Sequence, residues 1–312
     1  NRNINFDVEK LKNLDVKNRE LIQKKETLEK EKKEISKIKD KSLFEKSKII
    51  SKKIETIISE QKNVKNELNN ILSNLPNIAL ENVPIGKDET FNEVVSTHGE
   101  IKEFDFKPKT HFELGEKLKM LDFDLATKTT SSRFVFVKSE LASLERAISN
   151  YMIDLHTKIN GYLEISPPLI ANENTMFGTG QLPKFENDQF ELLLDDKSDR
   201  KFLIPTAEVI LTNMVKNKIL NIKDLPMRFV ASTPCFRKEA GSYGKDTKGM
   251  IRQHQFYKVE LVSIVENNKC EEELERMTKC ATMVLDNLEL PYRKVLLSTC
   301  LLYTSPSPRD LA

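Results

Sequence analysis

The sequence contains few of the residues that build metal centres, and it has no glycine-rich nucleotide loop. Its four cysteines, Cys235, Cys270, Cys280 and Cys300, form no CxxC pair, and its four histidines do not join them at zinc-ligand spacing. We therefore expect buried or free thiols and no metal site. Neither GxGxxG nor GxxxxGKS/T occurs among the nine glycines, which disfavours Rossmann and P-loop nucleotide sites.

Long apolar runs are absent too. No stretch approaches the roughly 18 apolar residues that cross a bilayer, and residues 1–12 lack the apolar core of a secretory signal. The chain has 312 residues, of which 38% are hydrophobic and 31% charged, a composition that can bury the cores of about two domains. We expect a soluble, cytoplasmic protein that does not bind membranes.

The clearest pattern in the sequence is a heptad repeat before Pro76. Apolar residues that recur every seven positions are Leu14, Leu21, Leu28 and Ile35, and an alternation of four and three, broken at Gln61, places Ile50, Ile54, Ile57, Val64, Leu68, Ile71 and Leu75. The pattern stops at Asp40, Lys41 and Ser42, and no proline interrupts either run. We predict two antiparallel helices over residues 7–74, packed through Leu21, Leu28, Ile57, Val64 and Leu68.

Charge is spread unevenly along the chain. The formal net charge is only +2, but residues 1–75 carry 19 Lys or Arg against 13 Asp or Glu, a net charge of +6. A basic segment of this kind indicates a polyanionic partner, although a lysine-rich helix can also be only a solvated face.

After Pro76 the sequence changes to mixed helix and strand signals. Residues 133–138 (RFVFVK) are typical of a strand, and residues 140–158 are typical of an amphipathic helix. Residues 226–237 and 254–265 are β-rich and flank a loop with Gly241, Gly244 and Gly249, which predicts an antiparallel hairpin with a long connection. We predict an α+β domain around an antiparallel sheet that starts near residue 90 to 110.

The ends of this hairpin carry groups suited to a nucleotide. Residues 237–239 (Arg-Lys-Glu) end the first run, and Arg252 precedes Phe256 where the second begins. Guanidinium groups form bidentate bonds to phosphate, and a phenylalanine ring can stack on a purine. Glu260 shares the strand face of Phe256, so its carboxylate could meet an amine. An ordinary surface hairpin with salt bridges is the alternative.

A longer stretch of the sequence, which includes these residues, resembles a known protein family. Residues 233–260 (TPCFRKEAGSYGKDTKGMIRQHQFYKVE) resemble the motif 2 hairpin of class II aminoacyl-tRNA synthetases in its seryl form. Residues 179–185 (TGQLPKF), 204–208 (IPTAE) and 77–88 (NIALENVPIGKD) are also similar to that family, in the same order. The resemblance implies a coiled-coil arm and connector over residues 1–90 and a class II antiparallel-sheet catalytic domain over residues 91–299.

The same resemblance implies an ATP site in the hairpin. Arg237 would hold the α-phosphate, Arg252 the terminal phosphates and Glu239 the adenine side, with Lys238 beside them and Phe256 stacked on the ring. Arg237 and Arg252 would be the catalytic residues. ATP is the expected substrate, and Mg²⁺ is expected in a complete enzyme.

Serine would bind beside this nucleotide. The resemblance implies that Thr206, Ala207 and Glu208 border the serine pocket and that Glu260 binds serine itself. A site that hydrogen-bonds a hydroxyl rejects alanine because its polar groups would stay unpaired. The alternative for residues 204–208 is a loop that enters a helix with Thr206 as its cap.

For partners, the resemblance implies serine tRNA and a homodimer. The basic arm would hold the long variable arm of tRNA across the dimer, and residues 241–252, with Lys245 and Lys248, would reach toward the acceptor end. Two other functions stay open, namely a relative that loads an amino acid onto a carrier protein and an inert structural coiled-coil protein.

The ends of the chain depart from the family. Residues 300–312 (CLLYTSPSPRDLA) do not resemble it, and we interpret them as a foreign tail. Motif 3 and the family's metal ligands would lie beyond this point, and the family's first residues before the arm are lacking. We therefore expect this chain to be an inactive fragment or a poor enzyme.

Overall fold

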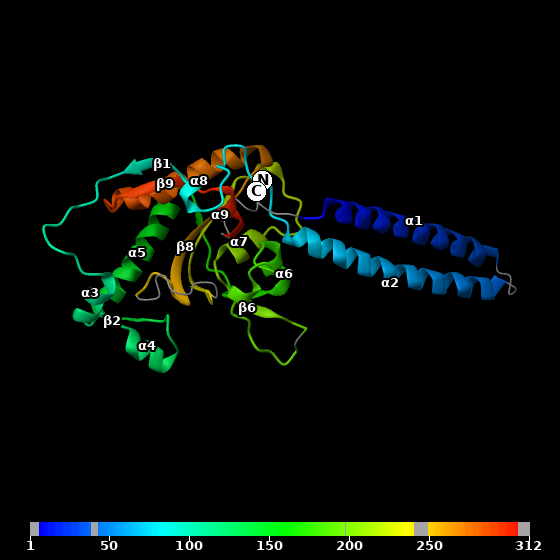
Figure 1. Ribbon diagram of the computed structural model, residues 1–312, viewed down its shortest axis with the longest axis horizontal. Coiled ribbons are helices and arrows are strands. Elements are labelled where there is room, and N and C mark those ends of the chain that lie inside the picture. The colour runs from blue at the N-terminus through cyan, green and yellow to red at the C-terminus, as the bar shows by residue number, and fades with distance from the viewer. Residues whose placement is uncertain (1–5, 39–42, 197, 240–248, 305–312) are drawn as a thin grey trace.

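The computed structural model describes residues 6–38, 43–196, 198–239 and 249–304. Two long helices, α1 (Val8–Ile38) and α2 (Phe44–Asn74), project from a globular body as an arm (Figure 1). At 1.5 Å per residue, 31 residues give each helix a length of about 45 Å. Among the described residues no helix is long and apolar enough to cross a membrane.

The arm packs as the heptads predict. Leu21 and Val64 are buried, and Leu28, Ile57 and Leu68 are half-buried between the helices. Ile35, Ile50 and Ile54 form a cluster at the far end. The two-helix prediction is confirmed, whereas the turn predicted at Asp40, Lys41 and Ser42 lies outside the described residues.

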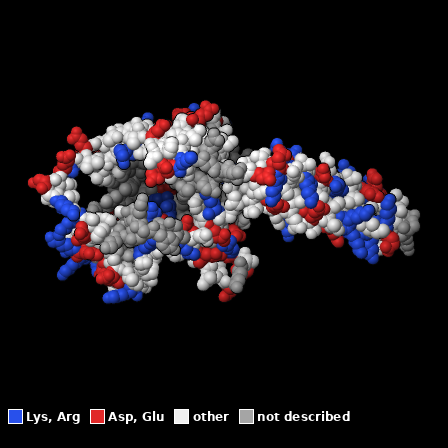
Figure 2. All heavy atoms as spheres, in the orientation of Figure 1, with Lys and Arg blue, Asp and Glu red and all other residues white. Residues whose placement is uncertain are grey.

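Polar contacts across the arm fix its antiparallel register. The ion pairs that join the helices are Lys10–Glu67 at 2.8 Å, Lys17–Glu60 at 2.9 Å and Lys46–Glu31 at 3.1 Å. At the heptad interruption, the Gln61 amide donates to Oδ1 of Asn18 at 3.5 Å. Basic and acidic side chains are intermixed along the face of the arm shown in Figure 2. Because exposed pairs contribute little free energy, the apolar seam supplies most of the stability.

A mixed sheet forms the centre of the body. Strands β7 (Met227–Phe236) and β8 (Gln255–Ile264) pair antiparallel over their whole length, which confirms the predicted hairpin strands. The short strand β4 (Leu163–Glu164) pairs parallel with β7 at one edge, so the sheet is antiparallel along the predicted hairpin and parallel at β4. Gly241 and Gly244 of the predicted connection lie outside the described residues.

The remaining elements surround this sheet. They are η2 (Glu89–Phe91), β1 (Glu93–His98), α3 (His111–Lys117), β2 (Leu121–Asp122), α4 (Phe123–Thr129), β3 (Phe136–Val137), α5 (Ser139–Lys158), β5 (Ile170–Asn172), α6 (Glu173–Gly178), η3 (Glu186–Asp188), β6 (Lys201–Leu203), α7 (Glu208–Asn213), η4 (Ile222–Asp224), η5 (Asn267–Lys269), α8 (Cys270–Asn287), β9 (Tyr292–Leu296) and α9 (Thr299–Thr304). The predicted helix over residues 140–158 is confirmed. The run 133–138 is a strand only at Phe136–Val137, and Arg133, with a φ of +64°, lies outside the extended region.

Successive β7 residues build two cores on opposite faces of the sheet. Phe229 and Ala231 pack with Ala207 and Leu211 around α7. Val230 packs on the other face, in a cluster with residues of α5 and α8. The period of two along a strand explains this division. It leaves the α7 face to position residues 204–208.

A buried ionic cluster fastens α8 to the sheet. Glu273, only 7% exposed, accepts two hydrogen bonds from Arg228 of β7 at 2.8 Å each and another from Nε of Arg276 at 2.9 Å. Burial opposes ionisation of this carboxyl, but the bonds from the two guanidinium groups outweigh it and lower the pKa of Glu273 to about 2. Arg276 also lies over the Tyr162 ring at 4.9 Å.

We predict that Glu273→Gln lowers the free energy of unfolding by roughly 3 kcal/mol at pH 7, because two half-buried guanidinium groups lose their buried counter-charge. The folded pKa lies below the ordinary value of 4.5, so this contribution is present above about pH 4.5 and is lost as the pH falls toward 2. Urea unfolding from pH 3 to pH 7 measures it. An equal difference between wild type and variant at all pH values would contradict the prediction.

Candidate functional site

The hairpin face that carries the predicted site is set by the β7–β8 register. Phe256, Lys258 and Glu260 alternate along β8 and lie opposite Cys235, Thr233 and Ala231 of β7. Ala231 belongs to the core around α7. The three β8 side chains therefore share the face toward residues 204–208.

Residues 204–208 meet this face directly. The N–H of Phe236 donates to the carbonyl of Ile204 at 2.9 Å, which ties the segment to the end of β7. The Thr206 hydroxyl donates to Oε2 of Glu260 and accepts from Nζ of Lys258 at 2.8 Å. Lys258 and Glu260 also form an ion pair. Thr206 is therefore at the centre of a hydroxyl, ammonium and carboxylate cluster.

The N-cap of α7 is Ala207, which makes no side-chain cap hydrogen bond, so the alternative with Thr206 as the cap is not what the structure shows. Thr206 nevertheless contacts the start of α7. Its Oγ1 accepts from the N–H of Glu208 at 3.3 Å. One hydroxyl thus supports the helix start and joins the polar cluster.

Arg237 connects that cluster to the aromatic ring. Its guanidinium lies over the Phe256 ring with Cζ at 5.2 Å from the centroid, and its Nε donates to the carbonyl of Pro205 at 3.2 Å. Because Pro205 adjoins Thr206, the cation, the ring and the Thr206–Glu260 pair come together in space. Their convergence does not fit an ordinary surface hairpin.

The remaining hairpin residues lie at its open end. Nη1 of Arg252 pairs with Oε2 of Glu239 at 3.1 Å, and the φ of Glu239 is +49°. Lys238 is exposed, its N–H donates to the carbonyl of Asp188 at 2.9 Å, and its Nζ lies 5.7 Å from the Phe190 ring. Lys245 and Lys248 lie outside the described residues. Arg252 therefore faces a carboxylate, which it would exchange for phosphate if a nucleotide binds.

The electrostatics of the site depend on two neighbouring acids. Glu208 is only 6% exposed, and burial raises its pKa to about 7, with a further rise from the Glu260 carboxylate that Lys258 and Arg237 partly offset. Ala207 is fully buried beside it. A carboxyl with this pKa changes its charge near neutrality and can accept a cationic group with little further cost in desolvation.

Two residues of this region were missed from the sequence. Lys258 was not among the predicted site residues, yet it bonds both Thr206 and Glu260. The alternation of Phe256, Lys258 and Glu260 was the signal that could have included it. For Arg200, described next, the sequence offers no local signal.

Arg200 supports the segment that contacts Lys238. It donates to Glu173 at 2.8 Å, to Glu186 at 2.5 Å and to both oxygens of Glu191 at 2.7 and 2.9 Å. These carboxylates come from α6, from η3 and from the bridge to β6. Asp188, which accepts from Lys238, lies between Glu186 and Glu191.

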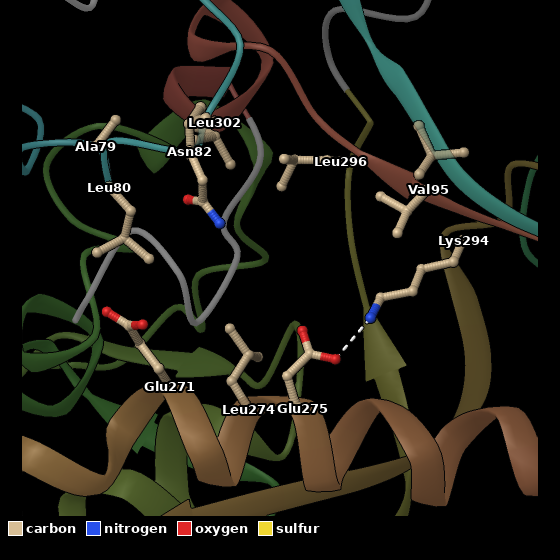
Figure 3. Close-up of a pocket in the computed structure, with 12 residues that line it drawn as sticks. Ala79, Leu80, Asn82, Val95, Glu271, Leu274, Glu275, Lys294, Leu296 and Leu302 are labelled. Carbon is tan, nitrogen blue, oxygen red and sulfur yellow. Dashed lines mark hydrogen bonds and ion pairs between the residues drawn. The ribbon is translucent and has the colours of Figure 1, made fainter.

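A separate cavity lies away from these residues. It has a volume of about 310 Å³ and is lined by the connector after the arm, by β1, β9 and α8, and by Leu302 (Figure 3). Its lining is mostly apolar, with one ion pair between Lys294 and Glu275 at 2.6 Å. None of the predicted site residues lines it.

Comparison with known proteins gives consistent results. A family model described as "tRNA synthetase class II core domain (G, H, P, S and T)" matches residues 185–307. A serine–tRNA ligase of Pelagibacter ubique is 69% identical over 298 residues, which are 96% of this chain and 71% of that protein. A serine–tRNA ligase of Parvibaculum lavamentivorans is 54% identical over 227 residues, which are 72% of this chain and 52% of that protein. The chain thus spans only about half the length of the second relative.

Two solved structures share the fold over nearly the whole chain. The seryl-tRNA synthetase from Pyrococcus horikoshii complexed with ATP superposes with a TM-score of 0.81 at 32% identity, covering 94% of this chain and 71% of that one. The cytoplasmic serine–tRNA ligase from Naegleria fowleri in complex with AMP gives a TM-score of 0.79 at 28% identity, covering 94% and 68%.

We predict that Glu208→Gln stabilises the fold at pH 8 by roughly 2 kcal/mol, because it removes a buried carboxylate that must ionise there. The folded pKa of about 7 exceeds the ordinary 4.5, so the wild-type penalty grows as the pH rises from 4.5 to 7 and is absent below that range. Denaturant unfolding at pH 4 and pH 8 tests this. A variant that is less stable at pH 8 would show that the Glu208 carboxylate is favourably paired.

Proposed function

This chain belongs to the serine–tRNA ligases, and from that premise we propose that its full-length protein activates serine with ATP and transfers the seryl group to the 3′ end of serine tRNA. The observation that carries the proposal is the convergence of Arg237 and Phe256 with the cluster of Thr206, Lys258 and Glu260. A nucleotide site and an amino-acid site thereby adjoin each other. The carrier-protein and inert coiled-coil alternatives have no observation in their favour.

In the proposed ATP site the adenine stacks on Phe256. Arg237, which lies over the ring, would bind the α-phosphate, and Arg252 would leave Glu239 for the terminal phosphates. Glu239 is then available to the adenine side. Lys238, exposed at the hairpin end, adds positive charge nearby.

The proposed serine site uses the polar cluster of Thr206, Lys258 and Glu260. Glu260 is already paired with Lys258 and Thr206, so serine would share these partners, its ammonium meeting Glu260 and its carboxylate meeting Lys258. Glu208, beside Ala207, is a second carboxylate for the amine or hydroxyl. Such a polar site disfavours alanine, which would leave these groups unpaired.

The proposed reaction has two displacements and no covalent enzyme intermediate. A serine carboxylate oxygen attacks the α-phosphorus, and the bond to the leaving pyrophosphate breaks. A terminal ribose hydroxyl of tRNA then attacks the seryl carbonyl and loses its proton as AMP leaves. Arg237 would stabilise the charge that develops on the α-phosphate, and the remaining contribution is positioning.

Magnesium is part of the proposal for the complete enzyme, as the companion of ATP. In the described part of the chain, no group of three or more His, Cys, Asp or Glu side chains is arranged to hold a metal ion. An ion that enters with ATP would meet phosphate oxygens, as Mg²⁺ commonly does, and the family resemblance implies further metal ligands beyond this chain.

The proposal extends to the arm and to assembly. The arm, with its net charge of +6 over residues 1–75, would bind the variable arm of serine tRNA through phosphate contacts. We further propose that the protein is a homodimer, that the arm binds tRNA across this dimer, and that the protein is cytoplasmic.

We predict that Arg237→Ala in the full-length protein lowers serine-dependent ATP–pyrophosphate exchange by roughly a hundredfold or more, because a preorganised donor to the developing charge is removed. Arg293→Ala on β9 is a matched control and should exchange like wild type. Unchanged exchange in Arg237→Ala would mean that Arg237 is only a surface charge.

We also predict that deletion of residues 11–72 leaves pyrophosphate exchange nearly intact and strongly weakens serylation of tRNA, because neither small substrate touches the arm. The log–log salt dependence of tRNA binding should flatten by about 0.7 to 0.9 for each phosphate group that the shortened protein no longer neutralises. Filter binding from 50 to 200 mM salt measures it. An armless enzyme that binds and charges serine tRNA normally would refute the proposed role of the arm.

A further inference from the structure

The open end of the hairpin is held by a segment outside the recognised motifs. The N–H of Met250 donates to Nε2 of His111, the first residue of α3, at 2.8 Å. On the other side of the hairpin, Nη1 of Arg133 donates to the carbonyl of Glu239 at 3.0 Å. The carbonyl of Arg133 in turn accepts from the N–H of His254 at 3.0 Å. Residues 111–133 therefore hydrogen-bond to both sides of the hairpin where it leaves the sheet.

The backbone is unusually constrained at these contacts. Arg133 and Glu239, which bond each other, have φ values of +64° and +49°, and Gly249 has a φ of +83°. A Cβ at Gly249 would lie 2.2 Å from Nε2 of His111, so the imidazole fills the space that a side chain would need. Non-glycine residues persist at positive φ only where their surroundings enforce it, and such positions gather at functional sites.

The hairpin residues that form these hydrogen bonds lie next to, or in, the Arg252–Glu239 ion pair. Met250 lies two residues before Arg252, and Arg133 bonds Glu239 itself. Building on the proposed ATP site, we propose that His111 and Arg133 are positioning residues that fix the backbone on both sides of the hairpin's open end and so keep Arg252 and Glu239 beside the place where ATP would bind. Neither residue contacts substrate in this scheme; each acts through the hairpin backbone.

The chemistry of the His111 bond allows a sharp test. A backbone N–H can only donate, so Nε2 must carry a lone pair and the ring proton lies on Nδ1. The terminal group of glutamine reaches about as far as Nε2 of histidine, whereas that of asparagine reaches only as far as Nδ1. His111→Gln can therefore retain the acceptor for Met250, and His111→Asn cannot.

The test measures pyrophosphate exchange in the full-length protein with ATP and serine varied separately. His111→Asn should raise the KM for ATP roughly fivefold, the effect of removing one hydrogen bond, and leave the KM for serine unchanged. His111→Gln should stay near wild type. His98→Ala, at an exposed histidine stacked on Tyr292 of β9, is the matched control and should show no change.

A double-mutant cycle that combines Gly249→Ala with His111→Ala tests the close approach of the His111 ring to Gly249. The added methyl group should raise the KM for ATP in the wild-type background, because it overlaps the His111 ring. In the His111→Ala background Gly249→Ala should raise the KM for ATP less, since only the backbone strain and the milder contact with the Phe112 ring remain. Strictly additive effects would overturn the proposed contact.

A measurement that does not depend on catalysis is the protection of the Met250 backbone amide against hydrogen–deuterium exchange. Hydrogen exchange of this amide should be faster in His111→Asn than in wild type and nearly unchanged in His111→Gln. If His111→Asn matches wild type in both protection and the KM for ATP, His111 is an ordinary surface residue. If the KM values for ATP and serine rise together with a lower melting temperature, His111 is merely structural.

The proposed function and this inference fail in different ways. A wild-type protein without serine-dependent exchange would refute the proposed function. Calorimetric ATP binding then still decides the role of His111, with binding about fivefold weaker in His111→Asn than in wild type if it positions the site. Equal ATP affinity in the two proteins would overturn the inference.

Discussion

The continuous ladder between β7 and β8 is the constraint on which the site depends. Ten residue pairs, from Met227 with Ile264 to Phe236 with Gln255, run without a bulge. A slip by one residue would turn Phe256, Lys258 and Glu260 to the opposite face, toward α5 and α8. The buried ion pair between Arg228 and Glu273 fastens the far end of this ladder, and the contacts of Glu239 and Met250 hold its open end.

Charge is used in two opposite ways in this body. Around Glu273 the carboxylate meets two guanidinium groups, which lower its pKa to about 2 and make it a fixed structural anion. Around Glu208, burial and the neighbouring Glu260 carboxylate raise the pKa to about 7, and Lys258 and Arg237 offset this rise only in part. The first arrangement contributes stability, whereas the second leaves a charge without full compensation, as sites that bind cationic ligands commonly do.

Local patterns predicted the elements of this protein well. The heptads predicted the arm helices because each seam position depends on neighbours three and four residues away, and the two β-rich runs predicted β7 and β8 nearly to the residue. The resemblance to motif 2 brought Arg237, Phe256 and Glu260 together correctly in space, although their roles stay proposals. The helices and strands were predictable because the spacing that marks each of them lies within one element, whereas the convergence of Arg237 with Phe256 followed from the family resemblance.

What the sequence could not predict depends on segments that meet only in the folded chain. Arg200 bonds three carboxylates from separate elements, and Arg228 meets Glu273 across 45 positions. The parallel pairing of β4 with β7 and the left-handed backbone at Arg133 are of the same kind. No periodicity marks such contacts, because they are set by how the elements pack and by no local preference.

The pairing of β1 with β9 imposes an order on folding. Glu93 must find Leu296, so this ribbon cannot close before nearly all of the described chain exists, whereas α1 and α2 contact each other as neighbours in sequence. Contacts between near neighbours form quickly and distant ones slowly. During synthesis from the N-terminus, the two helices of the arm can therefore pair while the body is still being made. The basic arm would then be folded close to the RNA-rich ribosome before the β7–β8 hairpin and its site residues have formed.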